Sequence, residues 1–365
     1  MITIQKEPSG IYPAYNDSYL HFDTSYTSDD RALINIDNKY NFTIYPDPQG
    51  DYLFNMREVV KAIINGNKFE DNIDYSLSGW GFSDESLYKA IDVEITAYGD
   101  GSTSTSNTTY TFNKAVKQYG DIELTNPYQL MLPSKDGINY YLTYFEGYPM
   151  EIPFKYLNSS DSITIKNERT EQITNAFSPS NDNPYRLFID KGASNFNSSG
   201  ILELPDMMSR LFIRESGVNK AVIELTKKAN KCGKYLKWFN SDGSYSYWLF
   251  NQWYKKDYSG SEIDRTNTNN FNNVYGNQEG ITRITGKAGE RGLKLRTAVT
   301  EYEKDHLVSL VTSPVVWMWS EESPYQNGEW IKVKLTSKGF TYANKKAINQ
   351  LQVDIQLPEI NTQTL

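Results

Sequence analysis

The sequence is poor in the residues that stabilise a fold by disulfide bonds or by bound metal. It contains one cysteine and two histidines in 365 residues. A single cysteine, Cys232, excludes an intrachain disulfide framework and a cysteine-based zinc site. The histidines, His21 and His306, lie far apart in the sequence, and neither has nearby carboxylates at metal-ligand spacing. We therefore expect no metal.

Long apolar runs and long basic runs are missing as well. No segment approaches the ~18 consecutive apolar residues that a membrane-spanning helix needs. The first ten residues lack the charged region, apolar stretch and cleavage site of a signal peptide. The net charge of −8 argues against nucleic acid as the main partner. These features predict a soluble chain that is made in a reducing compartment and does not enter a membrane.

The common catalytic motifs are not found. No G-x-S-x-G elbow is present. Residues 280–287, GITRITGK, place five residues between two glycines where a phosphate loop has four, and Ala288 replaces the hydroxyl that would reach magnesium. Glu321 and Glu322 are adjacent, so on a strand they would point to opposite faces rather than across a glycosidase cleft. We expect no enzymatic activity and no bound nucleotide, flavin or other cofactor.

Aromatic residues, in contrast, are abundant. They make up 14% of the chain, with 28 tyrosines, while hydrophobic residues reach only 38%. This balance is typical of β-rich proteins with much surface and is unlike disorder. The sequence therefore predicts an all-β fold of two β-sandwich-type domains with short bracketing helices.

The densest aromatic run is residues 234–250, KYLKWFNSDGSYSYWLF. Side chains alternate on both sides of Asn240 to Gly243, a cluster of turn-forming residues, which predicts a β-hairpin. Two interpretations are open: the rings form a domain core, or one face is an exposed platform that stacks on a sugar or a base. We predict that the structural core includes Tyr235, Trp238, Phe239, Tyr247, Trp248 and Phe250.

The remaining pattern predicts strands with few helices. A hairpin is expected over residues 31–45, followed by a short helix over 56–64 that Asn55 can cap. Residues 99–109 contain no large apolar side chain and are expected to form a long mobile loop. Strands are expected at 307–311 and at four further segments: 294–300, 315–319, 330–335 and 351–357.

Two domains are predicted, 1–183 and 184–365. The polar stretch 174–184, rich in Ser, Asn and Pro, is typical of a domain boundary. A short echo supports two related halves, because residues 50–60 and 200–211 both place a glycine and an apolar strand before a helix start. On this basis a helix is expected near 205–211.

Three segments carry a resemblance to a known family. The run at 234–250, the segment YPDPQGDYLFNMREVVKAI at 45–63 and the end QLQVDIQLPEINTQTL at 350–365 resemble virion proteins of tailed phages that infect Bacteroidetes, crAss-like phages or their relatives. Together these segments span most of the chain, but the first thirty residues resemble nothing in that family.

The resemblance implies a structural protein of the virion tail, in a tail hub, baseplate or connector, made in the host cytoplasm and assembled as a homo-oligomeric ring. Its partners would be copies of itself and other tail or connector proteins. Polar segments and free strand edges fit that role. A carbohydrate-binding module that recognises a host glycan is the alternative. Candidate assembly contacts are Leu351, Val353, Ile355, Pro358, Asn361 and Gln363.

Overall fold

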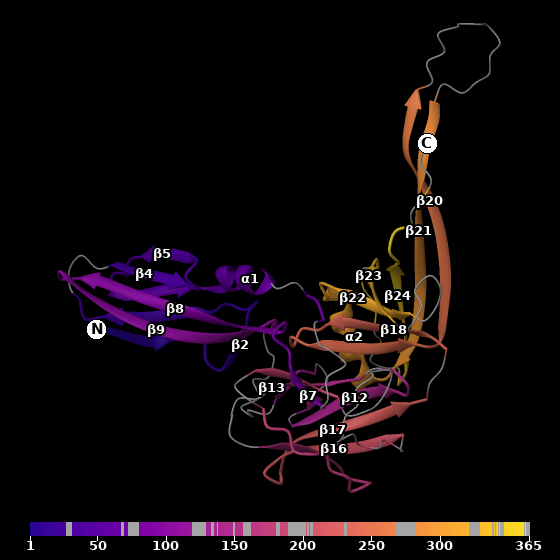
Figure 1. Ribbon diagram of the computed structural model, residues 1–365, viewed down its shortest axis with the longest axis horizontal. Helices are drawn as coiled ribbons and strands as arrows, with labels where there is room; N and C mark the ends of the chain where they lie inside the picture. The colour runs from indigo at the N-terminus through magenta and orange to yellow at the C-terminus, as the bar shows by residue number, and fades with distance from the viewer. Residues whose placement is uncertain are drawn as a thin grey trace, which may run out of the picture. The chain divides into compact units, whose positions relative to one another are not determined.

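The computed structural model shows an all-β protein (Figure 1). Strands dominate the part of the chain that the structure describes, and two helices, α1 and α2, are found there. The structure describes every residue except 27–30, 67–68, 72–79, 119–128, 133–134, 137, 149, 156–161, 180–182, 189–201, 203, 205–206, 230–231, 268–281, 321–328, 338, 340, 342, 344–346, 361 and 363–365.

The chain forms two compact units that do not divide at residue 183. Unit 1 comprises Met1–Asn230, Phe239–Ser246 and Asp305–Pro314, and unit 2 comprises Lys231–Trp238, Tyr247–Lys304 and Val315–Leu365. The predicted boundary falls inside unit 1 because the strand that starts at Pro184 pairs with the strand at Ile152–Lys155. Non-local strand pairing therefore overrides the polar composition of 174–184.

The first core of unit 1 lies between helix α1 and two sheets whose strands are mainly antiparallel. Buried side chains from both sheets, including Phe22 and Ile34, pack with Val60 and Ile64 of the helix. The elements are β1 (Ile2–Lys6), β3 (Tyr19–Thr24) and β6 (Asp51–Asn55) in one sheet, β2 (Ile11–Pro13), β9 (Ser102–Asn113), β8 (Tyr88–Gly99), β4 (Arg31–Ile36) and β5 (Tyr40–Ile44) in the other, and α1 (Arg57–Gly66).

Two local predictions in this region are confirmed and one is wrong. The hairpin at 31–45 turns at Asp37 and Asn38, which both have positive φ angles. Asn55 Oδ1 accepts a hydrogen bond from the Arg57 amide at 3.1 Å at the start of α1. The predicted loop at 99–109 is instead strand β9, because Asp100 and Gly101, at φ 50° and 72°, form a tight turn and Ser and Thr residues pair along β8.

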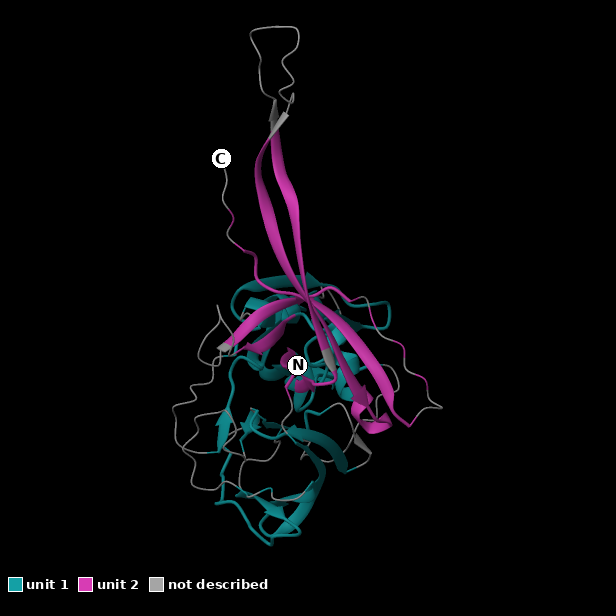
Figure 2. Ribbon diagram, turned by 90° about the vertical axis from the view of Figure 1, so that its right-hand side faces the viewer, with its two compact units in different colours: residues 1–230, 239–246, 305–314 teal, residues 231–238, 247–304, 315–365 magenta. Residues whose placement is uncertain are grey.

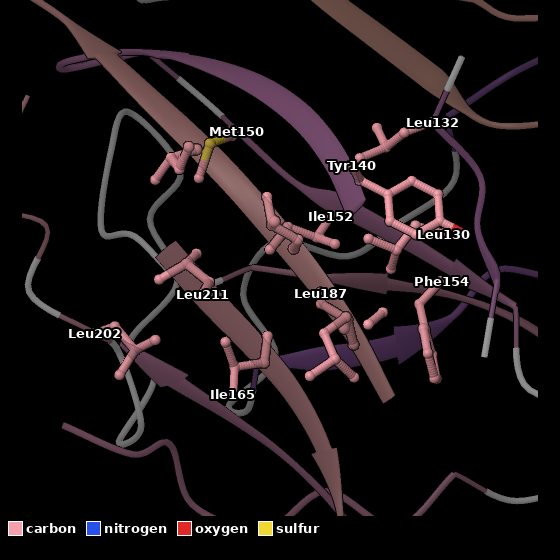
Figure 3. Packing of buried hydrophobic residues seen from close by; sticks show 14 of the residues in the cluster. Leu130, Leu132, Tyr140, Met150, Ile152, Phe154, Ile165, Leu187, Leu202 and Leu211 are labelled. Atoms are coloured by element: carbon pink, nitrogen blue, oxygen red, sulfur yellow. The ribbon is translucent and has the colours of Figure 1, made fainter. Parts of the chain in front are cut away.

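The second core of unit 1 is a sandwich of two further sheets. Figure 3 shows Phe154 and Leu187 of one sheet packed with Ile165 and Leu211 of the other. The first sheet contains β10 (Gln129–Leu130), β13 (Ile152–Lys155), β15 (Pro184–Leu187) and β7 (Gly81–Ser83). The second contains β11 (Lys135–Asp136), β12 (Asn139–Phe145), β17 (Val218–Lys228), β16 (Met208–Glu215) and β14 (Ile163–Asn167).

Unit 2 is organised by one seven-stranded sheet. Its order is β19, β18, β22, β23, β24, β21, β20, so the hairpin at 234–250 supplies one edge and a long hairpin supplies the other. The strands are β18 (Lys234–Phe239), β19 (Tyr245–Phe250), β20 (Trp253–Asn267), β21 (Thr282–Val299), β22 (Val316–Ser320), β23 (Glu329–Leu335) and β24 (Asn349–Gln356).

Two expectations about helices are corrected. The segment predicted as a strand at 307–311 belongs to helix α2 (Glu301–Thr312). Glu303 Oε2 accepts a hydrogen bond from the Thr300 amide at 3.0 Å, and this Thr-x-x-Glu capping box was the missed signal. The helix expected near 205–211 is not formed, since Met208–Glu215 is strand β16, so the proposed echo between the two halves fails.

Candidate functional site

The seven-stranded sheet of unit 2 has two chemically different faces. Side chains alternate between the faces along each strand. One face, here called the inner face, is buried: Trp238 and Leu295 are 0% exposed, and Trp248 Nε1 donates a hydrogen bond to Thr297 Oγ1 at 2.9 Å. The opposite face, here called the outer face, carries Tyr235, Lys237, Tyr247, Lys255, Asp257, Glu290, Lys294, Arg296, Trp317, Trp319, Trp330, Lys332, Lys334, Gln350, Gln352, Asp354 and Gln356.

Aromatic rings gather on the outer face where β18, β19, β22 and β23 meet. Trp330 lies at its centre, with ring centroids 5.2 Å from Trp319, 6.0 Å from Tyr235 and 6.0 Å from Tyr247. Tyr235 is buried, whereas Tyr247, Trp319 and Trp330 are partly exposed. The rings are mostly tilted or perpendicular to one another, an arrangement that is favourable for aromatic pairs.

Lys237 is enclosed by this aromatic cluster. Lys237 is 1% exposed, and its Nζ lies 5.0 Å from the ring centroid of Trp317 and 4.5 Å from that of Trp330. Both distances are within the range of a cation–π interaction, which is stronger at a desolvated site. The cluster therefore holds a cation inside a largely aromatic environment.

A strip of polar and mainly basic side chains continues across the outer face. Arg296 Nε donates a hydrogen bond to Gln352 Oε1 at 3.0 Å. Asp257 pairs with Lys255 at 3.1 Å and Lys294 at 3.6 Å. The hydrogen bond from Lys255 is the main cause that lowers the pKa of Asp257 below its usual value. This strip is exposed to solvent, unlike the inner face.

The long hairpin β20–β21 extends past the rest of this sheet (Figure 2). It pairs from Trp253 with Arg296 to Asn267 with Thr282, whereas β24 pairs with β21 only over Gly292–Val299. Gly289 and Ile360 form one more bridge. Beyond Gly289, no described strand pairs with either side of the hairpin; we call residues 261–267 and 282–288 the distal arm.

Unit 1 contains a separate cluster of buried charges around Arg186. Arg186 is 0% exposed and forms ion pairs with Asp71 at 2.6 Å, Asp84 at 3.1 Å and Glu151 at 2.5 Å. Its Cζ also lies 4.7 Å from the ring centroid of Tyr245. Burial raises the pKa of Tyr245 above its usual value.

Lys114 is a second buried cation in unit 1. It is 2% exposed, and its Nζ lies 4.5 Å from the ring centroid of Phe69. Desolvation lowers the pKa of Lys114 to about 8, and the negative charge of Asp84 opposes that shift. A perturbed pKa is typical of catalytic lysines, but burial leaves this amine little room to meet a substrate.

The predicted core residues fall in both units. Tyr235, Trp238, Phe239, Trp248 and Phe250 are at most 4% exposed, whereas Tyr247 is partly exposed on the outer face. The turn of the same hairpin belongs to unit 1, where Asn240 Nδ2 donates hydrogen bonds to Ser244 Oγ at 2.9 Å and Ser246 Oγ at 3.0 Å. No local sequence pattern predicts the basic outer face, because its cations come from four different strands.

Three of the predicted assembly contacts are corrected. Leu351, Val353 and Ile355 are each 1% exposed on the inner face, so they are buried within the chain itself and are not accessible to a partner. Pro358 is partly exposed, and Asn361 and Gln363 lie outside the described residues. Glu321 and Glu322 lie outside them too.

The described part of the chain shows neither a metal-binding cluster nor a membrane-spanning helix. No group of three or more His, Cys, Asp or Glu side chains there could hold a metal ion. None of the helices described is long and apolar enough to cross a membrane.

No protein-family model and no curated protein matches the chain. Among solved structures, a titin fragment is similar at 11% identity and a TM-score of 0.24, covering 62% of this chain and 98% of its own. Fibronectin(III)-like modules of Clostridium thermocellum CbhA match at 8% identity and a TM-score of 0.20, and the match covers 63% of this chain and 95% of theirs. The Pseudomonas aeruginosa CupB2 chaperone matches at 6% identity and a TM-score of 0.21, and the match covers 67% of this chain and 97% of the chaperone. Scores this low establish no shared function.

Proposed function

We propose that this chain is a non-enzymatic structural subunit of a larger assembly, and that its long β-hairpin contacts a neighbouring subunit. The distal arm is the observation that supports the proposal. A two-stranded ribbon is only marginally stable by itself in water, and residues 261–267 of β20 alone reach about 23 Å. An arm of this length is suited to packing against another molecule.

The side chains of the distal arm support an intermolecular role. Glu262, Ile263, Asp264 and Arg265 of β20 are all exposed. Ile263, at 52% exposure, is a large apolar residue on a segment with no core of its own. The pairing is irregular between Glu262 and Arg265. Irregular pairing and charged side chains discourage indiscriminate edge-to-edge aggregation, so we expect contact with one specific partner.

The assembly we propose is the tail of a bacteriophage virion, where the chain is one subunit of a homo-oligomeric ring in a hub, baseplate or connector. The resemblance of residues 45–63, 234–250 and 350–365 to virion proteins supports this choice. The all-β architecture is compatible with it, since closed rings need rigid subunits with heterologous contacts.

Shortening the arm tests the proposal. Ser261 faces Ala288 in the hairpin, so residues 262–287 can be replaced by Asn-Gly, which forms a two-residue turn. We expect the shortened protein to keep its CD spectrum and melting temperature but to lose the oligomers that the full chain forms by mass photometry. A full chain that is monomeric, or a shortened chain with unchanged oligomers, would contradict the proposal.

A further inference from the structure

The outer face of the seven-stranded sheet differs in charge from the chain as a whole. The chain has a net charge of −8, yet cations outnumber carboxylates among the described residues of this face. Asp257, Glu290 and Asp354 are the carboxylates. The cations are Lys237, Lys255, Lys294, Arg296, Lys332 and Lys334.

The cations form a path rather than a single point of charge. Lys332 and Lys334 are exposed two residues apart on β23, and Lys334 pairs with Gln356 of β24, which leads to Lys294 and Arg296 on β21. Strand spacings of ~4.8 Å and rises of ~3.4 Å give this path a length of roughly 25 to 30 Å from Trp330 to Arg296. This length matches several sugar rings of an extended chain.

The path begins at the aromatic cluster. Trp330 and Trp319 are partly exposed beside Lys332, and the apolar C–H face of a pyranose ring can pack on such an indole. The enclosed cation of Lys237 adds positive potential beneath these rings. Aromatic contact and positive charge therefore occur next to each other.

Hydrogen-bond acceptors on the path favour a ligand that carries hydroxyl groups. Gln352, Gln356, Asp257 and Asp354 lie among the cations, and carboxylates can only accept hydrogen bonds. Sugar hydroxyls donate to such groups, whereas the phosphodiester backbone of single-stranded DNA offers no hydrogen-bond donor. Single-stranded nucleic acid is typically bound by aromatic rings distributed along the path, whereas the ring contacts of the described side chains on this face lie around Trp330.

We propose that the outer face binds an acidic polysaccharide whose carboxylates pair with Lys332, Lys334 and Arg296 while one ring packs on Trp330. This binding is independent of the arm and goes beyond the structural role proposed above. It gives the chain a surface that recognises uronic-acid glycans.

The test measures binding of a polygalacturonate oligosaccharide to the full chain by isothermal titration calorimetry. We expect binding that weakens with added salt, at least tenfold weaker binding in the double variant Lys332→Gln, Lys334→Gln, and no binding to neutral dextran. The double variant Lys6→Gln, Lys89→Gln removes the same charge from exposed positions of unit 1 and should bind as the unchanged chain does.

Four results would overturn the inference. The first is no binding of polygalacturonate. The second is equal weakening in both double variants, which would indicate a general charge effect. The third is tighter binding of a single-stranded oligo-dT, which would make the face a nucleic-acid site. The fourth is a change of oligomeric mass in the Lys332→Gln, Lys334→Gln variant without glycan binding, which would make the face a contact between copies.

Discussion

Buried charges are the residue-scale feature that the structure adds to the sequence. Arg186 is surrounded by Asp71, Asp84 and Glu151, which come from segments far apart in the chain. A buried ion pair contributes little net stability compared with apolar residues, but removal of one partner is costly because the other charges stay buried. The cluster therefore makes folding of this part of unit 1 depend on one side chain.

Replacement of Arg186 by Met should lower the free energy of unfolding by ~3 to 5 kcal/mol. Arg210 offers a matched control, since it pairs with Glu224 at 2.7 Å but its side chain is 49% exposed; Arg210→Met should cost ~1 kcal/mol or less. Urea titration of both variants measures the difference. Equal losses would show that the burial of the cluster has no energetic importance.

The buried Lys114 should make the free energy of unfolding depend on pH in alkaline solution. Its pKa is about 8 in the folded chain and rises to its usual 10.5 on unfolding, so between these values the unfolded state holds more protons. The contribution of Lys114 to the free energy of unfolding should therefore rise from pH 8 to pH 10.5 and stay constant below pH 8. Comparison with Lys114→Met at each pH cancels the other titrating groups. A difference between the two proteins that is independent of pH would refute this assignment.

At the scale of elements, the turns of this chain follow from local sequence, whereas strand pairing does not. Alternation and the Asn, Ser, Asp and Gly residues at 240–243 predicted the hairpin of β18 and β19, and Asp37 and Asn38 predicted another. The apolar residues at 307–311 predict a strand, but the capping box at Thr300 and Glu303 begins helix α2 there. The strand at 102–109 was missed because small polar residues suggested a loop.

A glycine beside the aromatic hairpin tests how closely its strands pack. A Cβ at Gly233 would lie 2.6 Å from the Phe250 carbonyl oxygen, too close for any side chain. Gly233→Ala should therefore lower the free energy of unfolding by ~2 kcal/mol or more, as strain in a packed core does. Gly66→Ala is the control, because a Cβ there meets nothing within 4 Å. Thermal melts that show no difference between the two variants would contradict the packing described.

At the scale of the whole molecule, the sequence predicted the fold class but not its division. The all-β architecture follows from strand periodicity, which is local. The two units and the position of residues 184–230 depend on pairing between distant strands, such as β12 with β17 in parallel, and no local pattern encodes this. The outer face escaped prediction for the same reason: its cations become neighbours only when β20, β21, β23 and β24 assemble in one sheet.

Photocrosslinking from the distal arm is the most direct test of the structural role proposed for the chain. A photoreactive phenylalanine at Ile263, which is 52% exposed on the arm, is compared with one at Tyr302, which is 58% exposed on α2. If the arm contacts a neighbouring copy, irradiation of the assembled protein should yield covalent dimers from position 263 and few or none from position 302. Absence of dimers from position 263, or equal yields from both positions, would contradict the account.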